Sequence, residues 1–430
     1  MDDLNLEELL QQYYPKYTWR VGQRDIVEQI LAGHDVLALM PTGSGKSLCY
    51  QLPSLVMPGM TLVISPLIAL MQDQVSALRA QGISAAYLNR SLDSQEYRYV
   101  LWRIGRADYD LLYIAPERLQ SPRFWRLMQE VPISMVAVDE AHCISLWGHD
   151  FRPDYLRIHD FIQSLPHRPV IAAFTATASG PTQADIVKQL GMHDCKRYCQ
   201  SFDRPNLYLG VVYKRNKLKY LLEYLSRHSH SSGIIYCATR KSVDELSYRL
   251  NKADFKARAY HAGMRDDERR NSQAAFISGE CSLMVATNAF GMGIDKADVG
   301  FVIHYQLPLS VDAYYQEVGR AGRDGNPADC LLLYDENDQS LGRFLIDQSV
   351  PAEEQLSWHE TKRIRQAKYR QLELMDGYAR YRGCLRSYIL NYFGEESPGQ
   401  CGNCSVCSGH PEQNGRWQVI SRWLKRPSMN

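Results

Sequence analysis

The stretch PTGSGKS, Pro41–Ser47, has the residue types of a phosphate-binding loop. It follows the apolar run VLALM and leads into LCYQLPSLV, which can continue as a helix. Glycines allow backbone N–H groups to converge on phosphate oxygens, and a helix N-terminus adds positive dipole. Lys46 would reach the β- and γ-phosphates and Ser47 would hold Mg²⁺, although Met40 stands where the pattern usually has glycine. The alternative is a glycine-rich turn at a strand end.

Two carboxylates, Asp139 and Glu140, follow the apolar run MVAV. A strand that delivers two carboxylates to its C-terminal edge suits a Mg²⁺ ligand, Asp139, and a residue that polarises the attacking water, Glu140. Taken alone, the pair could also be a solvated strand end. Together with the phosphate loop it predicts an enzyme that hydrolyses a nucleoside triphosphate.

An aromatic-rich stretch, SLWGHDFRPDY, begins three residues after the acidic sequence VDEAH. Aromatic side chains give bases a sequence-tolerant stacking surface, and interleaved His and Arg add phosphate or cation–π contacts. The predicted DNA-binding residues are Trp147, His149, Phe151 and Arg152. Because the carboxylates are close in sequence, a strand pressing on these aromatics would shift Glu140 and make hydrolysis depend on DNA. Aromatics that simply pack the domain edge are the alternative.

Four cysteines cluster near the end of the chain, at Cys384, Cys401, Cys404 and Cys407. One thiol followed by a tight CGNCSVC knuckle suits tetrahedral Zn²⁺. No ligand position would remain open, so we expect a structural metal. An iron–sulfur cluster and four free cysteines are the alternatives.

The bulk properties exclude some classes and leave others open. At 430 residues the chain is long for one hydrophobic core, and its composition, 45% hydrophobic and 23% charged, is ordinary for globular proteins. The formal charge of +1 gives no global signal for nucleic acid, so any such surface must be a local patch. Without a signal-peptide pattern or a membrane-length apolar stretch, we expect a soluble, cytoplasmic protein with no membrane partner.

Short apolar runs alternate with helical stretches in two series along the chain. The first is DVLALMP, TLVISP, DLLYIAP, MVAVDE and PVIAAFTAT, and the second is GIIYC, KARAYH, SLMVATNAF, FVIHYQL and DCLLLYD. This rhythm predicts α/β domains with parallel sheets covered by helices. A basic stretch from Trp358 to Leu390 is predicted to be helical and leads into the cysteine cluster. The predicted units are residues 1–204, 205–338 and 339–408, with a tail at 409–430.

In the order in which they occur, these blocks resemble the motifs of superfamily 2 helicases, and specifically of the RecQ family of DNA helicases. The resemblance runs from about Tyr17 to Cys407. It rests on the phosphate loop, the acidic pair and the cysteine cluster, and on YTWRVGQ, SPLIALMQDQV, APERL, FTATA, IIYCATRK, YHAGM, VATNAFGMGIDKADV and YYQEVGRAGRDG. The aromatic stretch is similar to the family's aromatic-rich loop, with Leu146 where the family usually has Gln. The resemblance implies two tandem RecA-like domains followed by a small helical zinc-binding module.

The resemblance also implies site residues. Those expected to bind ATP are Arg20, Gln23, Thr42, Gly43, Ser44, Gly45, Lys46, Ser47 and Asp295. Arg320 and Arg323, three residues apart, can share a helix face and reach the γ-phosphate as arginine fingers from the second domain. Taken alone, GRAGR is more often a basic surface turn.

The predicted function is an ATP-dependent DNA helicase that translocates 3′-to-5′ on single-stranded DNA, with ATP, Mg²⁺ and Zn²⁺ as cofactors, in repair or recombination. The expected partners are single-stranded and tailed duplex DNA together with single-strand-binding and recombination proteins, with nucleoid association in a bacterium. Members of the family often continue into a winged helix and a terminal helical domain, and since this sequence stops at Asn430 we expect the chain either to lack these domains or to have been cut free of them. The rivals are an RNA helicase and a DNA-binding or annealing module with a vestigial ATPase.

Overall fold

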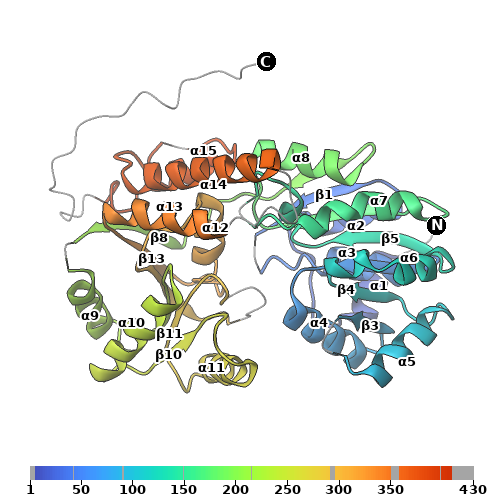
Figure 1. The fold of residues 1–430 in the computed structure, drawn as a ribbon, viewed down its shortest axis with the longest axis horizontal. Helices are drawn as coiled ribbons and strands as arrows, with labels where there is room; N and C mark the ends of the chain where they lie inside the picture. Colours follow the sequence, from blue (N-terminus) through green and yellow to red (C-terminus); the bar gives the residue numbers. More distant parts are fainter. Residues whose placement is uncertain are drawn as a thin grey trace, which may run out of the picture.

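The computed structural model describes residues 5–41, 43–89, 92–148, 150–214, 216–290, 296–349, 358–397 and 399–408. Two parallel sheets form two lobes that lie side by side, and a set of helices runs along one edge of both (Figure 1). No helix in the described part of the chain has the length and apolar character needed to cross a membrane.

The first lobe is built on a seven-stranded parallel sheet of order β3-β4-β2-β5-β6-β1-β7. Its strands are β1 (Val36–Leu39), β2 (Met60–Ile64), β3 (Ala85–Leu88), β4 (Leu111–Ile114), β5 (Ile133–Val138), β6 (Val170–Thr175) and β7 (Lys196–Cys199). Its helices are α1 (Leu6–Tyr13), α2 (Gln23–Leu31), α3 (Leu48–Ser54), α4 (Ile68–Ala80), α5 (Ser94–Ile104), α6 (Pro122–Gln129), α7 (Arg157–Ser164) and α8 (Gly180–Leu190), with 3₁₀ turns η1 (Pro116–Gln120), η2 (Ala141–Ile144) and η3 (Pro153–Leu156).

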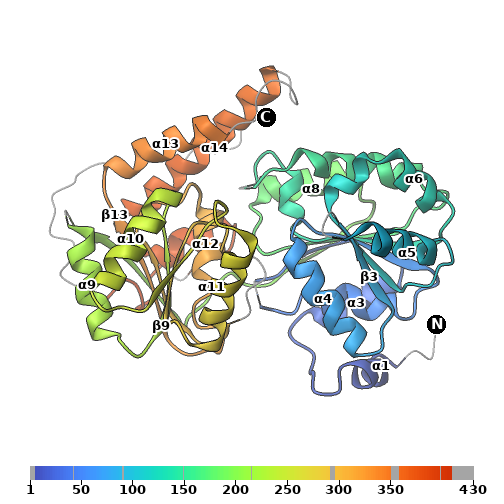
Figure 2. The ribbon, with the colours of Figure 1, turned by 60° about the horizontal axis from the view of Figure 1, so that its bottom comes forward.

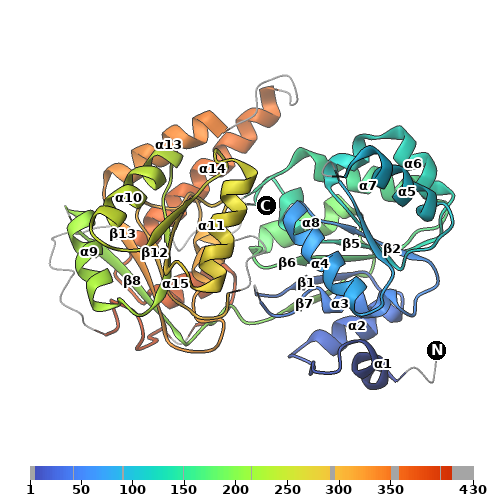
Figure 3. The ribbon, with the colours of Figure 1, turned by 90° about the horizontal axis from the view of Figure 1, so that it is seen from below.

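The second lobe is built on a six-stranded parallel sheet of order β10-β11-β9-β12-β13-β8. Its strands are β8 (Leu207–Tyr213), β9 (Ser232–Tyr236), β10 (Ala257–Tyr260), β11 (Leu283–Ala286), β12 (Val299–His304) and β13 (Ala328–Tyr334). Its helices are α9 (Lys217–Arg227), α10 (Arg240–Lys252), α11 (Asp266–Ser278) and α12 (Val311–Val318). Figures 2 and 3 show α11 on the side of this lobe that faces the first.

The two-sheet fold confirms the prediction, with strands that the apolar runs did not reveal. The runs that predicted β1, β2, β4, β5 and β6 are buried on both faces, as central parallel strands require. The prediction missed β3, β7 and β8. β3 contains two alanines and is short, and β7 is a largely exposed edge strand, so neither has a strong apolar signal. β8 is apolar, but it lies between the two series of apolar runs and was not assigned to either.

The C-terminal part, here called the helical module, comprises three helices and the cysteine knuckle Cys401–Cys407. Its helices are α13 (Asn337–Ser349), α14 (Trp358–Ala379) and α15 (Leu385–Tyr392). The prediction of one helix from Trp358 to Leu390 was wrong, because the chain turns at residues 380–384 and Cys384 begins a new helix as its N-cap. Figure 2 shows the α13–α14 pair projecting beyond the second sheet.

The segment between the sheets, residues 201–206, is here called the linker. Phe202 in it is buried and stacks on Phe393 of the helical module, with ring centroids 4.2 Å apart and planes 11° apart. Tyr315 of α12 packs edge-on against the same phenylalanine and donates its hydroxyl to the Phe202 carbonyl at 2.8 Å. Linker, second lobe and helical module therefore share one apolar core.

Candidate active site between the two lobes

The phosphate loop connects β1 to α3, as predicted. Gly43 and Gly45 have φ angles of +80° and +82°, and residues with a Cβ adopt such positive φ angles only at a cost in conformational free energy. A methyl group on Gly45 would lie 2.3 Å from the hydroxyl of Tyr17 and 2.5 Å from the amide nitrogen of Gln23. Glycine at this position is therefore required both by the backbone and by its neighbours. The Lys46 ammonium donates to the Met40 carbonyl at 3.3 Å, across the mouth of the loop.

Gln23 is fully buried and joins the segment before α2 to the phosphate loop. Its amide nitrogen lies 3.0 Å from the carbonyl oxygens of both Ser44 and Gly45, and its amide oxygen accepts the Arg20 N–H at 2.9 Å. The Arg20 guanidinium donates to the Gly43 carbonyl. Both predicted nucleotide-contacting side chains, Arg20 and Gln23, are thus bonded to the loop itself. Thr42 lies outside the described residues.

The two carboxylates stand at the C-terminal end of β5. Asp139 is buried and accepts from the Ser65 hydroxyl at 3.3 Å and from the Glu140 N–H at 3.0 Å. Burial and the adjacent Glu140 raise the pKa of Asp139 to about 6, against the opposing charge of Lys46. Glu140 has φ +46°, an unusual angle for a residue with a side chain, and such strain is found where a side chain must be aimed.

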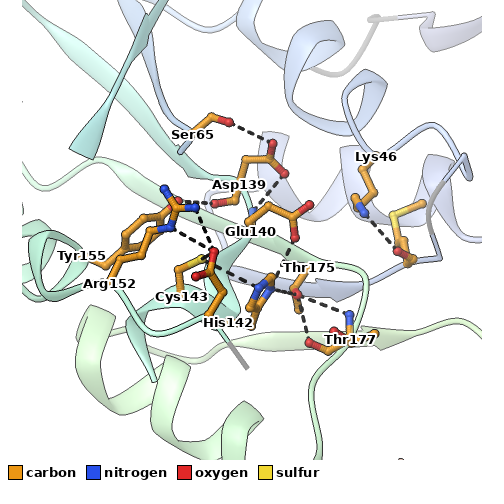
Figure 4. A network of polar contacts seen from close by, with 12 residues as sticks. Lys46, Ser65, Asp139, Glu140, His142, Cys143, Arg152, Tyr155, Thr175 and Thr177 are labelled. Atoms are coloured by element: carbon orange, nitrogen blue, oxygen red, sulfur yellow. Dashed lines mark hydrogen bonds and ion pairs between the residues drawn. The ribbon is translucent and has the colours of Figure 1, made fainter. Parts of the chain in front are cut away.

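A buried network links Glu140 to β6 (Figure 4). The Thr175 hydroxyl donates to the Thr177 carbonyl at 3.0 Å, so its oxygen accepts from Nδ1 of His142 at 2.9 Å. The same Nδ1 lies 3.3 Å from a Glu140 carboxylate oxygen. Burial lowers the pKa of His142 to about 4, so the ring is neutral and the contact with Glu140 is not an ion pair. The neutral His142 ring therefore lies beside the Glu140 carboxylate without neutralising its charge.

The aromatic loop, residues 145–152, follows directly in the chain after η2, the 3₁₀ turn that contains His142. The Ser145 hydroxyl donates to Asp185 at 2.6 Å and accepts the Trp147 N–H at 3.2 Å. A methyl group on Gly148 would lie 2.2 Å from the His142 carbonyl oxygen, so the loop folds tightly onto the residue that contacts Glu140. The Trp147 side chain is nevertheless 48% exposed, as a stacking surface requires.

The other predicted DNA-binding residues of the loop lie in different settings. Phe151 is half-buried, and Arg152 is held by Asp150 with nitrogen–oxygen distances of 2.9 and 3.0 Å. His149 lies outside the described residues. Trp147 is therefore exposed to solvent, whereas the Arg152 guanidinium is bonded to Asp150 within the loop.

The two arginines lie in the turn Gly319–Gly325 that follows α12, here called the arginine turn. The prediction that they share a helix face was wrong, because α12 ends at Val318 and Gly322, with φ +54°, turns the chain. Arg320 is buried beside Tyr236, where burial raises the pKa of the tyrosine to about 12 against the opposing charge of Arg320. Arg323 reaches the first lobe: a methyl group on Gly43 would lie 3.7 Å from its Cδ and 3.8 Å from its Nε. A second-lobe arginine therefore lies against the phosphate loop. Asp295 lies outside the described residues.

The arginine turn is fixed by the linker. The Arg204 guanidinium donates to the carbonyls of Ala321 and Gly322 at 3.1 and 2.9 Å. The Asn206 amide donates to the carbonyls of Gly322 and Asn326, both at 2.9 Å. These bonds hold the backbone that carries Arg323.

The four predicted cysteine ligands come together in the helical module. Their sulfur atoms all lie within 4.8 Å of one another, and tetrahedral Zn–S bonds of about 2.3 Å would place them about 3.8 Å apart. Cys384 is the N-cap of α15, where a thiolate is favoured by the helix dipole. Burial opposes ionisation of Cys384, but hydrogen bonds from Ser387 and the neighbouring thiols lower its pKa to about 6. The donor set and its spacing fit zinc.

Arg386 connects this cluster to the linker. Its side chain is buried, and it donates to Asp203, to the Arg204 carbonyl and to the Leu207 carbonyl, each at 2.6 Å. Its positive charge also interacts with Cys401. One side chain therefore connects the cysteine cluster to the linker that holds the arginine turn.

Comparison with protein families agrees with this architecture. Residues 20–186 match the DEAD/DEAH box helicase family, residues 216–325 the helicase conserved C-terminal domain, and residues 336–408 the RecQ zinc-binding family. The chain is 39% identical over 459 aligned residues to the probable ATP-dependent DNA helicase RecS of Bacillus subtilis, covering 94% of this chain and 91% of that protein. The chain belongs to the RecQ family. Recognition of this family from the sequence motifs is thereby confirmed.

The RecQ-family chain also matches longer relatives and distant folds. It is 44% identical to the ATP-dependent DNA helicase RecQ of Bacillus subtilis over 94% of its own length, but it spans 66% of that protein and 62% of the RecQ of Pasteurella multocida. Among solved structures, the DEAD-box helicase Mss116 bound to single-stranded RNA has a TM-score of 0.64 at 16% identity, covering 90% of this chain and 92% of that one. That likeness shows the shared two-sheet fold.

Three residues of this RecQ-family site were not predicted from the sequence. Arg204 and Asn206 lie in SFDRPNL, between the two series of apolar runs, and Arg386 lies in the basic stretch that was predicted to be helical. Two polar side chains in a short connector between domains could have signalled a fixed linker. Arg386 has no such signal, because its role depends on burial that only the fold reveals.

Proposed function

We propose that this protein is an ATP-dependent DNA helicase that couples ATP hydrolysis to movement along single-stranded DNA and so unwinds duplexes. The observation that carries the proposal is the position of Arg323, which reaches from the second lobe to Gly43 of the phosphate loop. A nucleotide bound at that loop would contact both lobes, so binding and hydrolysis would alter the fit between them.

The proposed chemistry assigns a role to each part of the site. Lys46 would leave the Met40 carbonyl to bind the β- and γ-phosphates, and backbone N–H groups of residues 43–47 would complete the cradle. Arg20 and Gln23, already bonded to the loop, would contact the base. Glu140 would accept the proton of the attacking water, with the neutral His142 ring beside its carboxylate. Arg323 would stabilise charge on the transferred phosphoryl group, with Arg320 beside it.

The metal ions fit the residues present. Ser47 and Asp139 would hold Mg²⁺, which supplies charge neutralisation to the phosphates when bound. Burial and the adjacent Glu140 raise the pKa of the Asp139 carboxyl, and a bound cation would favour its ionised form. Cys384, Cys401, Cys404 and Cys407 would hold Zn²⁺ in a structural role.

DNA would be sensed by the aromatic loop. The exposed Trp147 ring offers a stacking surface, and Gly148 packs on the carbonyl of His142, which in turn contacts Glu140. A base stacked on Trp147 would therefore act through two short contacts on the residue that positions the water. We further propose 3′-to-5′ translocation and a role in repair or recombination, both supported by RecQ-family membership.

Strand displacement tests this proposal directly. Duplexes with a 3′ or a 5′ single-stranded tail, in DNA and RNA versions, are incubated with protein, ATP and Mg²⁺. ATP-dependent unwinding of the 3′-tailed DNA alone is expected. Equal unwinding of the RNA version would support an RNA helicase, and DNA binding without ATP hydrolysis would support the annealing module.

A further inference from the structure

The aromatic loop of the first lobe is bonded to the helical module. The amide nitrogen of Gln371, on α14, donates to the Trp147 carbonyl at 2.5 Å. Gln371 is 9% exposed, on the same face of α14 as the buried Ile364 and Ala367. A buried donor that faces a loop carbonyl directly makes a specific contact, because either partner left alone would be costly.

A second part of α14 approaches the same loop. Lys368, three residues before Gln371, is half-buried, and burial lowers its pKa while the negative charge of Asp150 raises it. Asp150 in turn holds Arg152. The charge of Asp150 therefore acts on this part of α14, while Gln371 makes the direct contact with the loop.

α14 is anchored to the second lobe by packing and hydrogen bonding. Tyr378 near its C-terminus is fully buried, and its hydroxyl lies 3.1 Å from that of Tyr314 on α12, the helix that precedes the arginine turn. The Gln371–Trp147 bond thus joins the first lobe to a helix anchored in the second. It touches the loop on its backbone, which leaves the Trp147 ring available to a base.

We propose that Gln371 is a positioning residue that holds the aromatic loop ready for DNA. With the Trp147 N–H bonded to Ser145 and its carbonyl bonded to Gln371, the loop backbone is fixed on both sides of the ring before a strand arrives. DNA then binds an ordered loop and does not have to order it. This inference rests on the proposed DNA-stimulated ATPase, and it adds that the helical module takes part in DNA sensing through a defined side chain.

Gln371→Glu tests the inference with a side chain of the same size that cannot donate to a carbonyl. The matched control is Gln366→Glu, an exposed glutamine on the same helix, and Gln371→Lys restores a donor. Four properties are measured in the full chain: basal ATPase, the concentration of single-stranded DNA that gives half-maximal stimulation, melting temperature, and hydrogen exchange of a peptide covering residues 145–152 without DNA.

Loss of one hydrogen bond should raise the half-maximal DNA concentration about three- to tenfold in Gln371→Glu and speed exchange in the loop peptide. Basal ATPase of Gln371→Glu should stay at the wild-type value, while its melting temperature should fall modestly because a carboxylate then faces the Trp147 carbonyl. Gln366→Glu should match wild type, and Gln371→Lys should recover most of the loss. The inference is overturned if Gln371→Glu matches Gln366→Glu, if every activity falls with melting temperature, or if basal ATPase rises. Should wild type show no DNA stimulation, the proposed function fails, and the exchange comparison still decides whether Gln371 orders the loop.

Discussion

Replacing Arg386 by leucine removes the side chain that connects the cysteine cluster to the linker. Its three hydrogen bonds at 2.6 Å come from a charged donor, and such bonds contribute about 1.5–3 kcal/mol each. Two acceptors would find other partners: the Asp203 side chain is 38% exposed to water, and the Asn403 amide also donates to the Leu207 carbonyl at 3.2 Å. We therefore expect a loss of about 2–4 kcal/mol in the apparent free energy of unfolding.

The larger effect should fall on catalysis. The freed linker would no longer fix Arg204, whose guanidinium holds the carbonyls of the arginine turn. DNA-stimulated ATPase should drop at least tenfold while the Michaelis constant for ATP changes little, because the phosphate loop lies in the other lobe. Urea unfolding followed by tryptophan fluorescence, zinc content and steady-state ATPase are measured on Arg386→Leu and on the exposed control Arg382→Leu. Wild-type ATPase in a variant with lowered stability would refute the link between linker and arginine turn.

Four further outcomes are expected. Lys46→Ala should lower DNA-stimulated ATPase by several orders of magnitude and spare single-strand binding; near-wild-type turnover in a clean preparation would exclude the phosphate-site assignment. Trp147→Ala should cost about 1–3 kcal/mol of stacking at one base and reduce stimulated ATPase far more than DNA affinity, whereas uniform losses that track melting temperature would indicate packing alone. Burial lowers the pKa of His142 to about 4, so the unfolded state binds a proton at this residue before the folded state does as pH falls below 6.5. The free energy of unfolding should therefore decrease by up to about 3 kcal/mol between pH 6.5 and 4. In urea titrations, His142→Gln should remove that part of the pH dependence. Cys404→Ser should reduce bound zinc and destabilise the helical module without altering ATP binding, and iron with a visible absorption band in the native protein would contradict the zinc assignment.

Much of the fold was predictable because parallel strands buried on both faces appear as apolar runs. The phosphate loop and the cysteine knuckle were predictable because their chemistry depends on residues close together in sequence. The arginine turn illustrates the limit: a spacing of three suggested a helix face, but Gly322 turns the chain and Arg323 makes its contact across the gap between lobes. The contact between Gln371 and Trp147 joins residues far apart in the chain, so no local pattern could indicate it. The domain boundaries, the translocation polarity and the expected partner proteins stay predictions.

The linker also has a consequence for how the protein is made. Its fixing partners, Arg386, Glu395 and Asn403, all lie near the end of the described chain, and they bond residues 201–207. During synthesis each sheet can form soon after its strands leave the ribosome, since domains fold as units from the N-terminus. The bonds from the helical module to the linker cannot all form until residue 403 has emerged, about two hundred residues after the linker itself. A nascent chain that stalls before that point would therefore carry two folded lobes joined by an incompletely fixed linker.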